Sequence, residues 1–287
     1  MRIGIIVLPD QRWRVLSERW RRAEEYGFDH AWTYDHLGWR DLVDGPWFDA
    51  VPTLTAAALV TSRIRLGTMV ASPNFRHPVH FAREITALDD VSGGRITIGI
   101  GAGGFGFDAA VLGRPALSLR QRADRFIEFV ELLDLLLRKD RVTWQGEHYS
   151  AVDARNTPGC VQLPRVPFVL AGNGPRAVAL AARLGQGWVT NGGAEPGTDQ
   201  AGWWRSTAEM AARFADTGSS ADRYLVLDSA PIFSMSSAEH FADSVGRAAE
   251  LGFTDVLTHW PRESSWYAGS ESVLESVAAA LPALRTQ

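Results

Sequence analysis

Residues 64–104 decide the fold class, and they read IRLGTMVASPNFRHPVHFAREITALDDVSGGRITIGIGAGG. Strand-like runs occupy Ile64–Val70 and Arg95–Ile100. Residues 78–91 between these runs have helical spacing, and the glycine pair at 93–94 ends that helix. A strand, a helix and a second strand in this order predict a parallel βαβ unit.

The same alternation continues toward both ends of the chain. Helices are expected near residues 16–27, 50–60, 117–137, 175–184, 203–216 and 237–251. Further strands are expected at Ile3–Leu8, His30–Tyr34, Phe168–Ala171, Trp188–Asn191, Tyr224–Phe233 and Asp255–His259. Eight strands alternating with these helices predict an α/β fold, the (β/α)8 TIM barrel.

Arg141–Ala151 departs from this alternation. Its β-branched and aromatic residues alternate around Gly146, which predicts a small β-hairpin inserted after the fourth helix. An open doubly wound sheet is the alternative architecture. It would usually have a glycine-rich turn after its first strand, where this chain has Pro9–Gln11. Because such barrels run to about 250 residues, we expect one domain over residues 1–287.

The composition excludes several function classes. The chain is 46% hydrophobic and 22% charged with a net charge of −4, typical of a soluble protein without a nucleic-acid footprint. Cys160 is the only cysteine, which excludes an intrachain disulfide and agrees with a reducing cytosol. No apolar run reaches the roughly 18 residues of a membrane span. His77 and His80 lack further ligands, so they are expected to be surface or capping residues. We therefore expect a cytoplasmic protein with no metal, membrane or nucleic-acid partner.

Glycine clusters follow three of the predicted strands, at the end of the barrel where active sites form. They are Gly101–Gly104, Gly172–Gly174 and the pair after Asn191. Glycine lets backbone N–H groups approach a ligand closely, and Pro175 begins a helix whose terminus faces an anion. A single loop of this kind is more often just a tight turn. Three on one rim favour a phosphate site.

His36 follows the second strand with Asp35 and Trp39, and it could give or take a proton near neutral pH. A solitary histidine after a strand is more often structural, but this one lies on the functional rim. Several of the 11 tryptophans could stack on a planar ring or pack in the core. Those at or near predicted loops are Trp13, Trp39, Trp47, Trp188, Trp203, Trp204, Trp260 and Trp266.

These motifs together resemble the luciferase-like monooxygenase superfamily, and within it the deazaflavin (coenzyme F420) oxidoreductases. The resemblance covers most of the chain. The segments that match are AEEYGFD at 23–29, YDH at 34–36, RLGT at 65–68, RHP at 76–78, LDDVSGGR at 88–95, GIGAG at 99–103, GEHY at 146–149, AGNGPR at 171–176 and ARLGQGW at 182–188.

The resemblance implies hydride transfer with a deazaflavin or flavin ring. It places Asp35 and His36 beside the ring, with His36 as the proton relay and Trp39 as a further catalytic residue. It also implies a bulge after the third strand, with a cis peptide at Met69–Val70 that backs the ring. The cofactor-binding residues that follow are Asp35, Thr68, Met69, Val70, Ala71, Gly101, Ala102, Gly103, Gly172, Asn173, Gly174, Pro175 and Asn191. Substrate contacts are expected from Trp13, Trp39, His259 and Arg262.

One departure bears on the reaction. The sugar-phosphate dehydrogenases of this group often have a glutamate after the glycine motif, where this chain has Gly103–Gly106. We therefore expect an F420H2-dependent reductase of a C=C or C=N bond in a small or natural-product substrate, with Asp108 in a more distant polar role. The alternatives are an FMN-dependent monooxygenase that uses oxygen, and a cofactor-free binding subunit. The resemblance also implies a homodimer.

Overall fold

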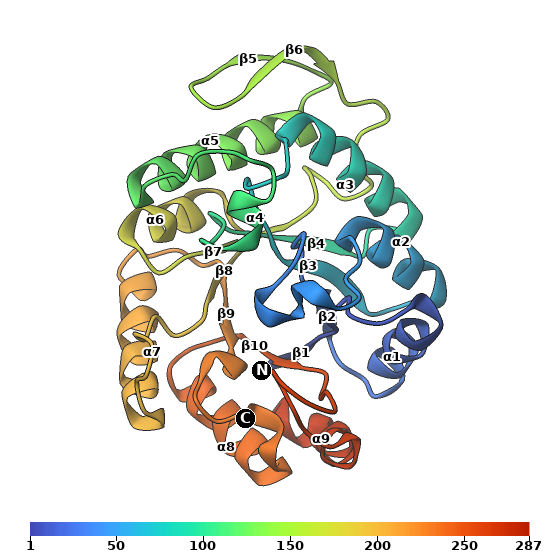
Figure 1. Ribbon diagram of the computed structural model, residues 1–287, viewed down its shortest axis with the longest axis vertical. Helices are drawn as coiled ribbons and strands as arrows, with labels where there is room; N and C mark the ends of the chain where they lie inside the picture. The colour runs from blue at the N-terminus through green and yellow to red at the C-terminus, as the bar shows by residue number, and fades with distance from the viewer. Residues whose placement is uncertain (287) are drawn as a thin grey trace. The chain divides into compact units, whose positions relative to one another are not determined.

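The computed structural model describes residues 1–286 (Figure 1). Within these residues eight parallel strands form a closed barrel in the order β1-β10-β9-β8-β7-β4-β3-β2, and helices connect them along the chain. The predicted (β/α)8 barrel is therefore confirmed. The barrel strands are β1 (Arg2–Ile6), β2 (His30–Thr33), β3 (Arg65–Ala71), β4 (Ile96–Ile100), β7 (Phe168–Ala171), β8 (Gly187–Thr190), β9 (Asp222–Val226) and β10 (Asp255–His259).

Most helices lie close to their predicted positions, but no helix was predicted at residues 107–110 or 271–284. The helices are α1 (Trp13–Glu25), α2 (Ala50–Val60), α3 (Pro78–Ser92), α4 (Phe107–Ala110), α5 (Leu119–Arg138), α6 (Pro175–Leu184), α7 (Gln200–Ala215), α8 (Ala238–Glu250) and α9 (Glu271–Leu284). The hairpin is also confirmed, as β5 (Arg141–Gln145) paired with β6 (Ser150–Arg155), and it lies outside α5 in Figure 1. The four-residue helix α4 was not predicted.

Contacts divide the chain into two compact units. Unit 1 comprises Met1–Leu8, Glu18–Trp32 and Val169–Gln287, and unit 2 comprises Pro9–Ser17 and Thr33–Phe168. A single domain over the whole chain stays a prediction.

In unit 2, β3 and β4 pair in parallel with a register shift between Thr68 and Ala71. The predicted cis peptide at Met69–Val70 is confirmed at the same place. Helix α3 begins where the His77 imidazole accepts a hydrogen bond from Val79 N, so His77 is a capping residue as expected. It ends at Gly93, whose positive φ of 63° suits a residue without a side chain.

In unit 1, tryptophans form much of the core. Trp188 stacks on Phe214 with ring centroids 4.7 Å apart, and Trp203 and Trp260 are almost fully buried. For these three tryptophans the structure favours core packing over a ligand contact. Trp13 and Trp266, by contrast, keep 37% and 42% of their surface exposed.

The prediction that strand seven extends to Phe233 was wrong. Strand β9 ends at Val226, and two short 3-10 turns follow at Leu227–Ser229 and Ser234–Ser236. The carboxylate of Asp228 accepts hydrogen bonds from the backbone N–H groups of Ser234 and His259, at 2.9 and 2.6 Å. This side-chain acceptor turns the chain where a strand ladder would otherwise continue.

Candidate functional site

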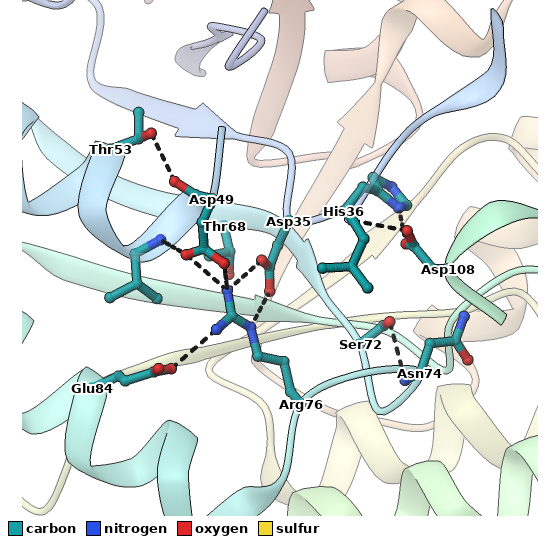
Figure 2. A network of polar contacts seen from close by, with 12 residues as sticks. Asp35, His36, Asp49, Thr53, Thr68, Ser72, Asn74, Arg76, Glu84 and Asp108 are labelled. Carbon is teal, nitrogen blue, oxygen red and sulfur yellow. Dashed lines mark hydrogen bonds and ion pairs between the residues drawn. The ribbon is translucent and has the colours of Figure 1, made fainter. Parts of the chain in front are cut away.

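Arg76 holds three carboxylates in unit 2, and Figure 2 shows it between them. Both oxygens of Asp35 accept hydrogen bonds from Arg76, at 2.7 and 3.1 Å. The same guanidinium pairs with Asp49, which caps α2, and with Glu84 on α3, each at 3.1 Å. Burial alone would lower the pKa of Arg76, but the hydrogen bonds and charge of Asp35 outweigh it and raise this pKa.

This network fixes the segment after β2. Asp35 is only 1% exposed, so its carboxylate anchors that segment to α2 and α3. A contact between Asp35 and a cofactor ring stays a prediction.

His36 follows directly and pairs with Asp108 (Figure 2). The imidazole Nδ1 lies 2.5 Å from Asp108 Oδ2, while Asp108 Oδ1 accepts from Leu37 N at 2.8 Å and from Gly38 N at 3.3 Å. Asp108 is buried, whereas the His36 side chain keeps 27% of its surface exposed. Asp108 is therefore the buried member of the pair, held in place by backbone N–H groups, and His36 is the member that reaches solvent.

Aromatic side chains pack against His36 and connect it to Trp39. Tyr34 packs edge-on against both His36 and Trp39, with ring centroids 5.7 and 5.2 Å apart. The indole N–H of Trp47 donates to the His36 carbonyl at 2.8 Å. Trp39 is thus joined to His36 through Tyr34. The catalytic role of Trp39 and the substrate contact expected of Trp13 stay predictions.

The bulge at Thr68–Ala71 is tied to β4. The Thr68 hydroxyl donates to the Gly99 carbonyl at 2.8 Å, and Gly101 N donates to the Ala71 carbonyl at 2.8 Å. A Cβ at Gly99 would lie 2.1 Å from the Thr68 carbonyl oxygen, so this close approach requires glycine. Thr68, Met69 and Ala71 are buried, and Val70 is the bulge residue with an accessible side chain.

Two arginines from α5 support the glycine loop after β4. Arg122 donates to the Gly103 carbonyl, and Arg125 donates to Asn74 Oδ1 at 2.6 Å. The Asn74 amide in turn donates to the Gly104 carbonyl at 3.1 Å. Arg122 and Asn74 therefore hold the loop directly, and Arg125 holds it through Asn74. The sequence spacing of these residues does not reveal the contacts.

These arginines have no acidic partner. Within residues 1–286 neither Arg122 nor Arg125 forms an ion pair, and the Nε of each is buried without a hydrogen-bond partner. The charges of Arg114 and Arg122 oppose that of Arg125. Burial lowers the pKa of Arg122 and of Arg125. Uncompensated positive charge beside a glycine loop fits an anionic group such as a phosphate.

The predicted glycine loop in unit 1 is also well defined. Gly174 caps α6 without a side-chain bond, and Pro175 occupies the first turn. Asn173 donates to Asn191 Oδ1 and accepts from the Thr190 hydroxyl, both at 2.7 Å. Nothing lies within 4 Å of the position that a Gly174 Cβ would occupy. The open N-terminus of this ten-residue helix suits an anion.

His259 was expected to contact substrate, and the structure buries it instead. Its side chain is 0% exposed, its Nδ1 lies 2.8 Å from Asp228 Oδ2, and Tyr267 stacks on it at 3.6 Å between ring centroids. No part of this side chain is therefore accessible to a substrate in this structure. Arg262 donates to the carbonyls of Ser264 and Trp266 at 3.2 and 3.3 Å, which organises the loop after β10. The substrate contact of Arg262 stays a prediction.

No group of three or more potential metal ligands occurs within residues 1–286. In the same part of the chain, no helix has the length and apolar character needed to cross a membrane.

Comparison with known proteins identifies the family. A family model described as luciferase-like monooxygenase matches residues 1–249. The chain belongs to this family. It is 39% identical over 175 residues to an F420-dependent glucose-6-phosphate dehydrogenase of Beutenbergia cavernae, which covers 60% of this chain and 50% of the relative. It is 31% identical over 193 residues to a 5,10-methylenetetrahydromethanopterin reductase of Archaeoglobus fulgidus, covering 67% of this chain and 53% of the relative.

Solved structures confirm the fold of this family member. An F420-dependent secondary alcohol dehydrogenase has a TM-score of 0.78 at 20% identity, with 99% of each chain covered. A monooxygenase from Streptomyces bottropensis has a TM-score of 0.78 at 19% identity, with 97% of each chain covered. The chain spans about half the length of the curated relatives it matches.

Proposed function

We propose that this protein is an F420-dependent oxidoreductase that reduces a C=C or C=N bond in a small or natural-product substrate. The pair of α5 arginines without acidic partners beside the glycine loop is the observation that carries this proposal. Relatives named as F420-dependent enzymes support the choice of cofactor. The absence of an acid in Gly103–Gly106 argues against a sugar-phosphate oxidation.

The residues fit an anionic deazaflavin. Arg122, Arg125 and the backbone of Gly101–Gly103 would hold its phosphate, and the Gly174 turn offers a helix terminus for the same chemistry. The accessible face of the Thr68–Ala71 bulge, with Val70, would support the ring. When bound, the reduced cofactor supplies a hydride to substrate carbon.

His36 supplies the accompanying proton. Its ring is partly exposed at the end of β2, so its Nε2 can reach a substrate atom next to the carbon that receives the hydride. Together with the hydride that a bound cofactor would supply, this proton would complete a two-electron reduction of the substrate double bond. Exposed Leu37 and Phe107, which are 38% and 44% accessible, suit an apolar substrate body.

Anaerobic fluorescence titration with F420 and, separately, with FMN tests the cofactor. We expect saturable binding of F420 and much weaker binding of FMN. Tight FMN binding without F420 binding would make the protein a flavin-dependent monooxygenase. A folded protein that binds neither would be a binding subunit. Oxidation of F420H2 in the presence of an enone or imine panel then tests the reaction.

We also propose that the protein pairs as a homodimer, because large apolar side chains such as Leu119 and Leu163 are 71% and 87% exposed. Sedimentation at working concentration is the test, and a monomer would refute the proposal.

A further inference from the structure

We propose that Asp108 is a positioning residue that keeps the proton of neutral His36 on Nδ1, so that Nε2 is the atom that exchanges protons with substrate. This inference rests on the proposed function only for its consequence in catalysis. The observation beneath it is the contact of 2.5 Å between His36 Nδ1 and Asp108 Oδ2. An ionised carboxylate only accepts hydrogen bonds, so the ring nitrogen that faces it carries the proton.

The orientation of Asp108 is fixed independently of His36. Its Oδ1 accepts hydrogen bonds from the backbone N–H groups of Leu37 and Gly38, and Asp108 itself is only 6% exposed. Oδ2 is therefore left to face the imidazole. Because the carboxylate also binds the two residues that follow His36, one side chain sets both the path of this loop and the direction of the ring.

The arrangement gives the two ring nitrogens separate roles. Nδ1 is occupied by a buried carboxylate, while the His36 side chain is 27% exposed. A proton delivered to substrate therefore leaves from Nε2, and the remaining neutral ring keeps its proton on Nδ1. Nε2 is then ready to be protonated again from solvent. The carboxylate also holds the ring in the orientation that keeps Nε2 free of it.

Asp108→Asn should reverse the preference of His36 for the Nδ1–H tautomer, with little change in the shape of the side chain at position 108. Oδ1 must stay an acceptor for Leu37 N and Gly38 N, so the amide NH2 group is placed against His36 Nδ1. A nitrogen that faces a donor is stable only without its own proton, and the ring proton moves to Nε2. We expect the imidazole to remain in place but in the wrong tautomer, which in other Asp-His pairs lowers turnover by up to about 10⁴-fold.

Long-range ¹H–¹⁵N NMR of the cofactor-free protein tests this, at about pH 9 where free imidazole is neutral. His36 is assigned from the signal that disappears in His36→Gln. We expect the Nδ1–H form in the wild type, the Nε2–H form in Asp108→Asn, and no change in the control Asp153→Asn, an exposed hairpin carboxylate. An Nε2–H form in the wild type, or the same tautomer in both proteins, would overturn the proposal.

Kinetics supply the second readout. Asp108→Asn should lower kcat about 10²- to 10⁴-fold while KM and the Kd for F420 change only a few-fold. A kcat within threefold of the wild type would refute a positioning role. Since the NMR experiment needs neither cofactor nor substrate, it decides the role of Asp108 even if F420 proves to be the wrong cofactor.

Discussion

Arg122→Met should separate cofactor affinity from fold stability. Methionine keeps the apolar contact with Phe105, over which the guanidinium lies at 4.2 Å, but removes the positive charge. In the free protein two effects oppose each other. Loss of the hydrogen bond to the Gly103 carbonyl costs about 1 kcal/mol, and removal of a partly buried charge without an acidic partner returns a similar amount. The free energy of unfolding should therefore change by less than about 1 kcal/mol.

In the F420-bound protein, no second effect compensates for the loss of the Arg122 charge. Two unit charges 4 Å apart attract by about 4 kcal/mol at an effective dielectric constant near 20, and partial exposure of Arg122 reduces this. We therefore expect the Arg122–phosphate contact to contribute about 1.5–3 kcal/mol, as a hydrogen bond to a charged group does. The Kd for F420 should thus rise about 10- to 150-fold.

Fluorescence titration with F420 and urea unfolding of the cofactor-free protein measure the two quantities. Arg120→Met is the matched control, because Arg120 lies on the same helix two residues away and its side chain is 90% exposed. We expect this control to change the Kd by less than about twofold, since exposed charges are screened. An equal rise in the Kd for F420 in both variants would refute a phosphate contact. So would an Arg122→Met Kd within threefold of the wild type.

Three further outcomes are expected. His36→Ala should lower turnover about 10²-fold or more with F420 affinity nearly unchanged, and steady-state kinetics that show full turnover would make this imidazole structural. Gly174→Val should weaken F420 binding. It should not unfold the protein, because the added Cβ meets nothing within 4 Å and the φ of −75° accepts valine. Unchanged affinity in a titration would contradict this prediction. For Asp255, burial that raises the pKa is outweighed by hydrogen bonds from Arg2 and His30, so the pKa is lowered. The stability contributed by its charge is therefore present above the unfolded value of about 3.9 and is lost as pH falls through the folded pKa. The gap in urea midpoint between wild type and Asp255→Asn should shrink from pH 7 toward pH 3, and a constant gap would refute this account.

The barrel was predictable because each βα unit carries local signals of its own. Pro78 and Gly93 mark the two ends of α3 through backbone preferences that act within a few residues. The end of β9 was not predictable, since Asp228 accepts hydrogen bonds from Thr258 and His259 of β10, about 30 positions away. Helix α4 has one turn, and its N-cap residue Gly106 provides no side-chain hydrogen bond, so no sequence signal predicts this helix.

The site was predictable only in part. His36 and the glycine loops stand out because each follows a predicted strand, the position from which barrel active sites are built. The cis peptide at Met69–Val70 came from family resemblance. Asp108 lies 72 positions from His36, and Arg125 lies 51 positions from Asn74, so only the fold brings these partners together.

The partner of His36 sits on the smallest helix of unit 2. Helix α4 has four residues, and the large side chains around it, Phe105, Phe107 and Leu112, are 44–68% exposed. Little apolar surface is therefore buried to hold this turn, and short helices are marginal without such packing. Local opening of α4 costs far less than unfolding of the barrel. On warming, the protein should therefore lose the His36–Asp108 pair, the proposed proton relay, while the barrel is still folded. The melting temperature would then overstate the temperature range of the proposed activity.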